Sequence, residues 1–388
     1  MNEANKRICI LTTSFPRWKN DNRSPFLLEY ARALQNEGYH ITVVAMHTSG
    51  AAKQEILENI LIVRLKYLPE RWETLQETRA GIPAAWKKNK ISIVLIVLYI
   101  IRMLGFLIKN GYKFEIIHAQ WTISSFAAML YKPIFKGKVV TTVHGSDVFS
   151  IKTSSFLKKI TKVTLLKSDR IICVSSALKS QLENWGIDSN KISVIPNGVD
   201  LDRFPLNKFD KEKIILFVGS LTKNKNVNVL IQSFAKIHLI YNDYKLIIIG
   251  DGDELSKLKD LAFSLKVENS IEFVGSLSPE DISKNMLIAS IFVLPAINEG
   301  FGVVLVEALA AGLPCIGSNS GGITDIITEN VGYLFTPNDF DQLTDLLIHL
   351  IDDKNCYQSL SKNARLHVEE NFQWKKIVKK FREEFENI

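Results

Sequence analysis

Short runs of consecutive apolar residues alternate along this chain with longer stretches in which apolar residues recur every three or four positions. The short runs are RICILTTS, HITVVAM, EIIHAQ, KVVTTVHG and RIICVSS in the first half, then KIILFVGS, YKLIIIG, SIEFVG, IFVLPA and LPCIGS in the second. A strand that is covered on both faces has this pattern, because neither of its faces meets water. Such strands between helices predict an α/β fold with doubly wound parallel sheets.

The segment VIPNGVDLDRFPLNKFDKEK separates two strand-helix series, and it holds two prolines, a glycine and a run of charges. This composition is typical of an interdomain linker. A chain of 388 residues is also longer than most chains that fold around a single hydrophobic core. We therefore predict two domains, residues 1–197 and 198–371, with a final amphipathic helix within 372–388 that packs back onto the first domain.

Residues 91–108 form an unusual stretch, ISIVLIVLYIIRMLGFLI, in which Arg102 is the single charge. Lysines flank it on both sides. Its length is marginal for a bilayer with a hydrocarbon core of about 30 Å. We expect a buried or surface helix of the first domain, and this interpretation is favoured over membrane contact. An interfacial helix with basic flanks is the alternative.

The net charge of +7 is unevenly distributed, since residues 1–200 carry 28 Lys+Arg against 15 Asp+Glu, or +13, and the remainder carries −6. A basic half can serve nucleic acid, an anionic membrane surface or a phosphorylated substrate. No aromatic residues interleave with the basic ones in a nucleic-acid motif, so we expect no nucleic-acid partner. Four scattered cysteines without CxxC spacing fit a reducing cytosol, and we expect a cytoplasmic protein that can contact the inner face of a membrane.

The candidate chemistry is concentrated in NEGFGVVLVE, residues 298–307, which follows the strand IFVLP and opens a helix that ends at Gly312. Free N–H groups in a first helical turn, with glycines that permit close approach, form a phosphate site without side-chain charge. The residues whose amides would bind the phosphate of such a ligand are Gly300, Phe301, Gly302 and Val303.

Two carboxylates flank this helix end. Glu299 lies in the loop, and Glu307 lies about one turn into the helix, where helical side chains lean back toward the N-terminus. A carboxylate among Val, Leu and Ala is costly unless something hydrogen-bonds it. A donor with hydroxyls on either side of a diphosphate would use both, the ribose at Glu307 and the sugar at Glu299. The alternative is that Glu307 satisfies a backbone group or an arginine elsewhere.

With these residues the chain resembles a family 4 glycosyltransferase of GT-B fold, the retaining and metal-independent kind. Its signature of two glutamates separated by seven residues matches at Glu299 and Glu307. Further matches are VTTVHGSD, SDRIICVSSALKSQL, VIPNGVDLDRF, FVGSLTKNKNVNVLIQSFAKI, IIIGDGDELSKLKDLA, SGGITDII and GYLF. The resemblance implies two Rossmann-like domains facing a central cleft, the first for the acceptor and the second for the nucleotide-sugar, with no cofactor.

The resemblance also implies roles for individual residues. Lys225 would hold the donor diphosphate, for which an ammonium is chemically apt, and Glu299 would bind a hydroxyl of the transferred sugar. His144, at the carboxyl end of the strand KVVTTV, would face the sugar from the other domain. Asp147 would orient His144 or meet the acceptor, unless it only caps the following turn.

Three positions depart from the family pattern. Family members commonly have arginine where this chain has Ser220. The usual glycine pair of the first strand-helix loop is also missing, and that loop reads TTSFPRWKNDNRSPF. Our hypothesis is that Arg17 or Arg23 supplies the charge that is missing at position 220. The third departure is Thr324-Asp325 in place of Pro-Glu.

Asp251-Gly252-Asp253 resembles the Asp-x-Asp that binds a divalent cation in other transferases. It follows a strand end and precedes a helix, where Asp253 is a natural N-cap. We therefore predict no metal site.

The predicted function is transfer of a hexose-type sugar from a UDP- or GDP-sugar to a glycan or lipid-linked glycan, in cell-surface polysaccharide synthesis. The alternative is a GT-B sugar-nucleotide epimerase, which needs no acceptor. A dinucleotide-binding protein is disfavoured because no G-x-G-x-x-G follows an early strand.

Overall fold

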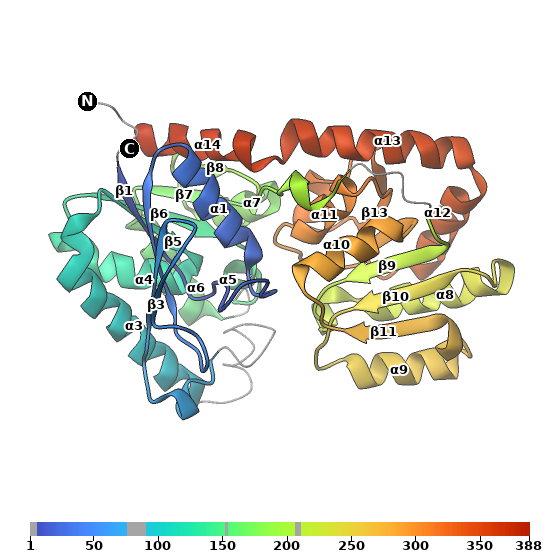
Figure 1. Ribbon diagram of the computed structural model, residues 1–388, viewed down its shortest axis with the longest axis horizontal. Helices are drawn as coiled ribbons and strands as arrows, with labels where there is room; N and C mark the ends of the chain where they lie inside the picture. The colour runs from blue at the N-terminus through green and yellow to red at the C-terminus, as the bar shows by residue number, and fades with distance from the viewer. Residues whose placement is uncertain (1–5, 76–90, 152–153, 206–210) are drawn as a thin grey trace. The chain divides into compact units, whose positions relative to one another are not determined.

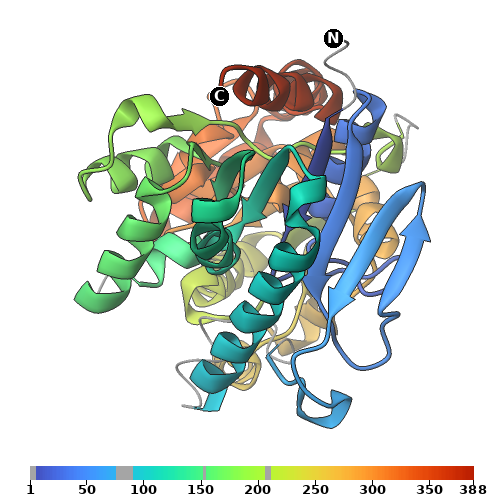
Figure 2. The ribbon, with the colours of Figure 1, turned by 90° about the vertical axis from the view of Figure 1, so that its left-hand side faces the viewer.

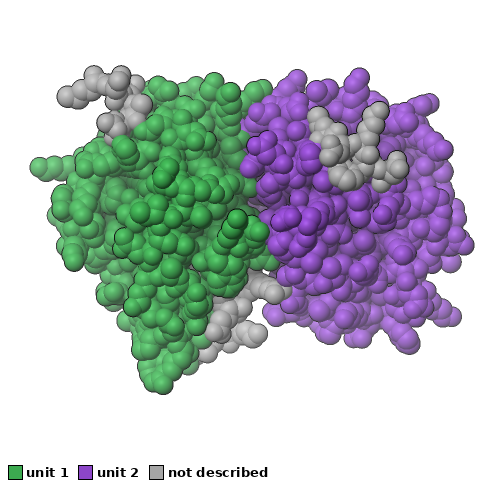
Figure 3. Space-filling model, in the orientation of Figure 1, with its two compact units in different colours: residues 1–197, 374–388 green, residues 198–373 purple. Residues whose placement is uncertain are grey.

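The computed structural model describes residues 6–75, 91–151, 154–205 and 211–388. The chain divides into two compact units, which are coloured separately in Figure 3. Unit 1 comprises residues 1–197 and 374–388, and unit 2 comprises residues 198–373. Each unit contains its own sheet with helices beside it, so the predicted α/β class is confirmed (Figure 1).

The sheet of unit 1 is parallel except at one edge, where β3 runs antiparallel to β4. Its strands lie in the order β3 (Gln54–Leu57), β4 (Ile60–Leu65), β2 (His40–Met46), β1 (Arg7–Leu11), β5 (Ile116–Gln120), β6 (Lys138–Val143), β7 (Arg170–Cys173) and β8 (Ile192–Val194). The helices of this unit are α1 (Pro25–Asn36), α3 (Ile91–Asn110), α4 (Trp121–Tyr131), α5 (Ser146–Phe149), α6 (Ser155–Leu166), α7 (Ser176–Glu183) and α14 (Trp374–Glu386).

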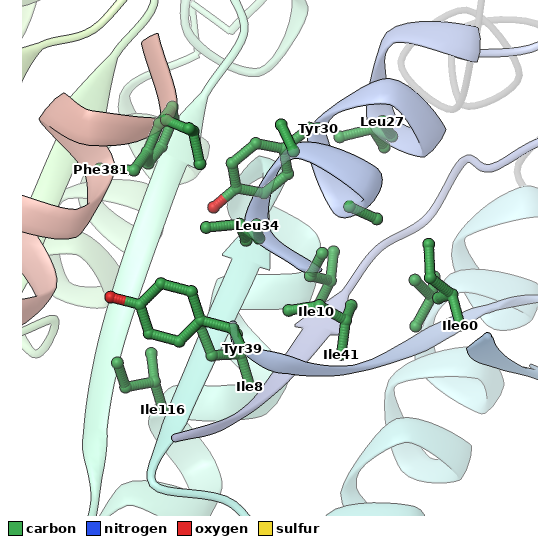
Figure 4. Close-up of a cluster of buried hydrophobic side chains, with 14 of the residues drawn as sticks. Ile8, Ile10, Leu27, Tyr30, Leu34, Tyr39, Ile41, Ile60, Ile116 and Phe381 are labelled. Carbon is green, nitrogen blue, oxygen red and sulfur yellow. The ribbon is translucent and has the colours of Figure 1, made fainter. Parts of the chain in front are cut away.

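Both faces of this sheet are covered, which explains why its strands are apolar at consecutive positions. On β1, Ile8 and Ile10 point into a core that α1 and α14 complete (Figure 4). Cys9 and Leu11 point to the opposite face, into a second core completed by α3 and α4. Alternate residues of a strand face opposite sides, so a strand between two cores needs apolar residues throughout.

The C-terminal helix α14 belongs to unit 1, although it follows the last element of unit 2 in the sequence. Its first residue, Trp374, donates its indole N–H to Glu29 Oε2 of α1 at 2.8 Å. Farther along the helix, the ring of Phe381 packs on Tyr30, with the centroids 4.7 Å apart. The chain's end therefore packs on the first half, as predicted, through a hydrogen bond and an aromatic contact.

Helix α3 is the predicted apolar segment, and it runs along the outside of unit 1 (Figure 2). One side packs on the sheet and on α4 through Leu95, Tyr99, Met103 and Leu107, and the Tyr99 hydroxyl donates to Thr12 O at 2.8 Å. The other side is exposed although it is apolar, and it carries Ile91, Val94, Val97, Ile101 and Ile108. By length and composition alone the stretch Ile91–Lys113 could cross a membrane, but its packed side belongs to the core of unit 1.

The sheet of unit 2 is parallel throughout. Its strands lie in the order β11 (Ile271–Gly275), β10 (Lys245–Ile249), β9 (Ile214–Val218), β12 (Ile291–Leu294), β13 (Cys315–Ser318) and β14 (Gly332–Phe335). Its helices are α8 (Val227–Ile240), α9 (Leu255–Ser264), α10 (Pro279–Ile288), α11 (Val303–Ala310), α12 (Phe340–Asp352) and α13 (Lys354–Asn371). This is the order of a Rossmann sheet, in which the chain reverses its direction of winding between the first and fourth strands.

Candidate active site

The two strands at which the winding of unit 2 reverses, β9 and β12, carry the loops with the main candidate residues. Lys225 ends the short helix η7 (Lys223–Lys225) in the loop after β9, and Glu299 lies in the loop after β12. The two loops are joined where Ile297 N–H donates to Asn224 O at 2.7 Å. Ligands of open α/β sheets bind outside the carboxyl ends of the strands at such a point.

The structure brings Lys225 and Glu299 into direct contact. The Lys225 ammonium forms an ion pair with Glu299 Oε2, and each side chain is only 19% exposed. The lysine predicted to bind a diphosphate and the glutamate predicted to bind a sugar thus neutralise each other. An ammonium next to a carboxylate can bind a ligand that has both an anionic group, for the ammonium, and hydroxyls, for the carboxylate.

The end of α11 lies beside this pair. Gly302 precedes the helix with φ 97°, a left-handed conformation that favours glycine, and Leu305 N–H closes the first turn onto Gly302 O at 2.9 Å. The first N–H groups of a helix have no partner within it, so the backbone from Gly300 to Val303 can donate to an anion. Phe301 contributes only its backbone, because its ring is buried and packs near Phe372.

A third loop, after β13, fixes the backbone of Glu299. Gly322 N–H donates to Glu299 O at 2.8 Å, and Ser320 Oγ accepts from Asn298 N–H at 3.0 Å. Gly321 has φ 63°, and a Cβ atom there would lie 2.2 Å from Glu299 O. Gly321 of the SGGITDII motif therefore allows the close approach that holds Glu299 in place.

Glu307 lies on α11, 7% exposed, and Arg203 Nη1 donates to its Oε1 at 2.9 Å. Burial raises the pKa of Glu307, and the Arg203 guanidinium opposes this effect without cancelling it. The arginine partner that the alternative interpretation expected for Glu307 is therefore present, and it is Arg203. A carboxylate has about four lone-pair sites, and the hydrogen bond from Arg203 uses one of them. Glu307 can therefore accept further hydrogen bonds from a ligand.

Ser220 is half-buried in the first part of the β9 loop, where no arginine is present. The GDG motif packs against this part: a Cβ atom on Gly250 would lie 1.8 Å from Gly219 O, and Leu221 N–H donates to Asp251 O at 3.0 Å. The backbone beside Ser220 is thus fixed by close contact with the neighbouring strand's loop.

The prediction that Asp253 caps the next helix is wrong. Helix α9 begins at Leu255, its N-cap is Glu254, and no side chain caps it. The reason is that Glu254 N–H donates to Leu221 O at 3.0 Å, which places the helix start one residue later. Asp251 Oδ1 instead accepts from Gly252 N–H at 2.8 Å. Within the described ranges, no three His, Cys, Asp or Glu side chains gather as metal ligands would.

His144 belongs to unit 1 and follows β6. Its ring lies near two others, 4.5 Å from Trp121 and 5.4 Å from Phe26 between centroids. Its Nε2 lies 2.7 Å from Gln120 Oε1. Burial lowers the pKa of His144 to about 3, so the ring is neutral near pH 7. A neutral ring that donates from Nε2 presents Nδ1 as an acceptor.

Gln120, which is not among the predicted site residues, connects His144 to a buried polar chain. Its Nε2 lies 3.2 Å from His118 Nε2, and His118 Nδ1 lies 2.7 Å from the Tyr30 hydroxyl. His118 Nε2 is also 2.7 Å from Thr142 Oγ1. Because the Gln120 amide donates toward His118 and accepts from His144, its two ends determine which nitrogen of each imidazole carries the proton. The signal in the sequence was the presence of two polar residues, His118 and Gln120, within the buried strand EIIHAQ.

Asp147 is buried and holds the backbone next to His144. Its Oδ1 accepts from the N–H groups of His144 and Gly145, both at 3.1 Å, and its Oδ2 accepts from Thr122 N–H at 3.1 Å. Burial raises the pKa of Asp147 to about 6, although these backbone hydrogen bonds lower it. Asp147 therefore orients His144 through the main chain, and its role toward an acceptor stays a prediction.

Arg17 lies in the loop after β1 of unit 1 and already has a carboxylate partner. Its guanidinium donates to both oxygens of Asp21 at 2.7 Å and lies 4.1 Å from the Trp18 ring centroid. Burial raises the pKa of Asp21, but the hydrogen bonds from Arg17 outweigh that effect and leave it lowered. A donor phosphate would have to compete with Asp21 for Arg17, so the proposed role of Arg17 stays a hypothesis.

Two family models match this chain and together span most of it. The model of "Glycosyltransferase Family 4" matches residues 25–203, and the model of "Glycosyl transferases group 1" matches residues 199–367. The first covers most of unit 1, and the second covers most of unit 2 with the lysine and glutamate loops.

Characterised proteins and solved structures of similar sequence or fold agree with these models. N-acetyl-alpha-D-glucosaminyl L-malate synthase of Bacillus anthracis is 29% identical over 69% of this chain and 73% of its own length. UDP-Gal:alpha-D-GlcNAc-diphosphoundecaprenol alpha-1,3-galactosyltransferase of Escherichia coli is 33% identical over 63% of this chain and 68% of its own. Sucrose-phosphate synthase from Thermosynechococcus elongatus superposes with a TM-score of 0.80, at 20% identity and 98% coverage of both chains. Anabaena HepE, solved with UDP-glucose, gives a TM-score of 0.78 at 18% identity, covering 99% of this chain and 100% of its own.

Proposed function

The chain belongs to the family 4, group 1 glycosyltransferases, and on that premise we propose that it moves a hexose-type sugar from a nucleotide-sugar to a glycan or lipid-linked glycan. The observation that carries this proposal is the Lys225–Glu299 ion pair at the switch point of unit 2, with the amide end of α11 beside it. The diphosphate of the donor takes Lys225 and these amides. Glu299 is thereby released to accept a hydrogen bond from a hydroxyl of the sugar.

The reaction breaks the bond between the anomeric carbon and an oxygen of the diphosphate. The acceptor hydroxyl oxygen forms the new bond to that carbon, and its proton passes to the departing phosphate. Lys225 and the first-turn amides stabilise the negative charge on the leaving oxygen, which is where charge develops in the transition state. The resemblance to the family supports front-face attack with retention of the anomeric configuration. It also supports a reaction without a metal, in which Lys225 and the amides supply the positive charge.

We propose a UDP-sugar as the donor, with a GDP-sugar as the alternative. The Escherichia coli relative uses UDP-Gal by its name, and HepE was solved with UDP-glucose. On the nucleotide side, the ribose hydroxyls would donate to Glu307. A carboxylate can accept from two neighbouring hydroxyls, which suits a ribose.

For the acceptor we propose a lipid-linked, diphosphate-bearing glycan used in cell-surface polysaccharide synthesis, reached at the cytoplasmic face of a membrane. The Escherichia coli relative acts on a diphosphoundecaprenol substrate by its name. In this chain, residues 1–200 carry a net charge of +13, and α3 exposes Val94, Val97 and Ile101 along one side. A basic unit with an exposed apolar helix suits peripheral contact with an anionic bilayer.

The first test is a thermal-stability screen of UDP- and GDP-sugars in the presence of EDTA, because a ligand that binds only the folded state raises the melting temperature. The stabilising donor is then incubated with a polyprenyl-diphosphate-linked glycan, and the anomeric configuration of the product is read by NMR. We expect a UDP-sugar to stabilise the protein and to give a retained linkage. Conversion of the donor alone into an epimer would instead show the epimerase. Stabilisation by no nucleotide-sugar would contradict the proposal.

A further inference from the structure

Glu307 is a carboxylate in apolar surroundings, and the structure provides it with a cation from a distant segment. The rest of α11 consists of valine, leucine and alanine, most of them buried. A buried carboxylate stays ionised only if a cation or several hydrogen bonds stabilise its charge. Among the described residues, the side chain that binds the Glu307 carboxylate is Arg203, which donates to Oε1. The Oε2 atom is left to accept from a ligand.

Arg203 is itself held in position by several contacts. It ends the short helix η6 (Leu201–Arg203), whose N-cap Asp200 accepts from Asp202 N–H at 3.0 Å. Its Nη2 donates to the carbonyl of Pro279, the first residue of α10, at 3.2 Å. The guanidinium also lies 5.3 Å from the centroid of the Phe204 ring, which is fully buried. These contacts fix the guanidinium in place.

The same short segment is fastened to the other end of α11 by a second arginine. Arg365 Nη1 donates to Phe204 O at 2.7 Å and to Ala310 O, at the last residue of α11, at 2.9 Å. Its Nε binds Glu369 at 2.8 Å. Arg365 thus secures the segment without bonding to Glu307, and this difference provides a matched control.

We propose that Arg203 is a positioning residue for donor binding, which keeps Glu307 ionised and oriented so that its free oxygen accepts from the ribose hydroxyls. The inference rests on the proposed function, because it takes Glu307 as the ribose ligand. It adds the residue on which that ligand depends. Arg203 stands six residues after the boundary between the units, so the segment that enters unit 2 also completes its donor site.

The other charged groups around α11 are already occupied, and the Lys211 ammonium donates to the carbonyl groups of Met286, Leu287 and Ala311. On α10, Glu280 and Asp281 are paired with Lys284, and all three side chains are exposed. On α13, Arg365 is occupied by Glu369 and two carbonyl groups. Burial already raises the pKa of Glu307, and the Arg203 cation opposes this effect. Loss of the Arg203 charge therefore raises that pKa further. The carboxyl group then takes up a proton at a higher pH and loses acceptor capacity.

The test is UDP binding by calorimetry from pH 5.5 to 8.5, with GDP as a second probe. The proteins are the parent, Arg203→Met, Arg203→Lys and the control Arg365→Met. We expect Arg203→Met to bind UDP at least tenfold more weakly at pH 6 and to recover affinity as the pH rises. Arg203→Lys retains a cation and should follow the parent's pH profile. Circular dichroism confirms that each variant is folded.

Two results would overturn the inference, and they differ in what they say of the donor site. We expect the UDP affinity of Arg365→Met to change with pH as the parent's does. The same result for Arg203→Met would show that Arg203 is only structural, and it would leave the proposed donor site intact. A parent that binds neither UDP nor GDP at any pH would overturn the donor site and this role together. As a further check, Arg203→Met should add no pH dependence in a Glu307→Gln background.

Discussion

Lys225 and Glu299 form an ion pair that joins the loops after two adjacent strands of unit 2. Removal of the ammonium by Lys225→Ala takes away the side-chain cation of the diphosphate site, and a charge-assisted hydrogen bond to phosphate is worth about 1.5–3 kcal/mol. We expect donor affinity to fall roughly 10- to 100-fold by calorimetry. Lys223→Ala, which changes an exposed lysine of the same turn, is the matched control and should leave the affinity unchanged. Equal losses in both variants would contradict the assignment to Lys225.

The two glutamates should differ in the step that they affect. Glu299→Gln removes the charge on the sugar side, so we expect a large loss of transfer rate without a loss of UDP affinity. Glu307→Gln removes the charge on the nucleotide side, so UDP binding itself should weaken. Transfer assays and calorimetry on both variants measure the difference, and equal effects on both quantities would rule out separate roles.

Arg17 should affect donor binding only if it can leave Asp21. If Arg17 supplies the charge that Ser220 lacks, Arg17→Ala weakens donor binding. Asp21→Asn should strengthen it, because the bidentate partner that competes with phosphate loses its charge. Donor affinities of these variants and of Arg23→Ala test the hypothesis. Unchanged affinity in both arginine variants would exclude it.

His118 should make unit 1 sensitive to acid. Burial lowers its pKa from 6.5 to about 3, so the unfolded chain binds a proton in this range and the folded chain does not. The stabilisation is therefore fully present above pH 6.5 and is lost as the pH falls toward 3. The slope is about 1.4 kcal/mol per pH unit for one such group.

The measurement for His118 is the free energy of unfolding between pH 4 and 6.5 by denaturant titration. All six tryptophans lie in the residues of unit 1, so their fluorescence reports on that unit. We expect the slope with pH to be smaller in His118→Gln by about the contribution of one proton. His40→Gln, at an exposed position, is the control. A slope in His118→Gln equal to the parent's would refute the assignment.

The exposed side of α3 should govern binding to lipid. Val97 and Ile101 are 49% and 56% exposed, so Val97→Glu with Ile101→Glu should leave folding intact. Two added negative charges on this apolar side should reduce flotation with anionic vesicles about tenfold or more, since anionic lipids repel them. Leu239→Glu, on an 86% exposed residue of α8, is the control. Vesicle binding that survives the α3 substitutions would exclude this surface.

Much of the fold could be predicted from the sequence because its local patterns have local causes. Each of the ten apolar runs contains a strand, and α1 ends before Gly38, which has φ 91°. Strands β3, β4, β8 and β14 are not among the predicted ones. Strand β3 lies at the sheet edge and is largely exposed, so its sequence QEIL lacks the apolar run of a covered strand. Strand β8 has only three residues, too few to show a period.

The sequence by itself determined the α/β class, the places of ten of the fourteen described strands along the chain and the glycine-bounded loop that carries Glu299. These follow from the periodicity of apolar residues and from glycines that permit unusual backbone angles. Only the tertiary structure decided which charges meet, because Lys225 with Glu299 and Arg203 with Glu307 come together through strand order and not through spacing. It also decided which side of α3 is packed. Apart from Arg102 and its polar C-terminal end, that helix is apolar on all sides, so its sequence does not distinguish the side that faces the sheet from the side that faces out.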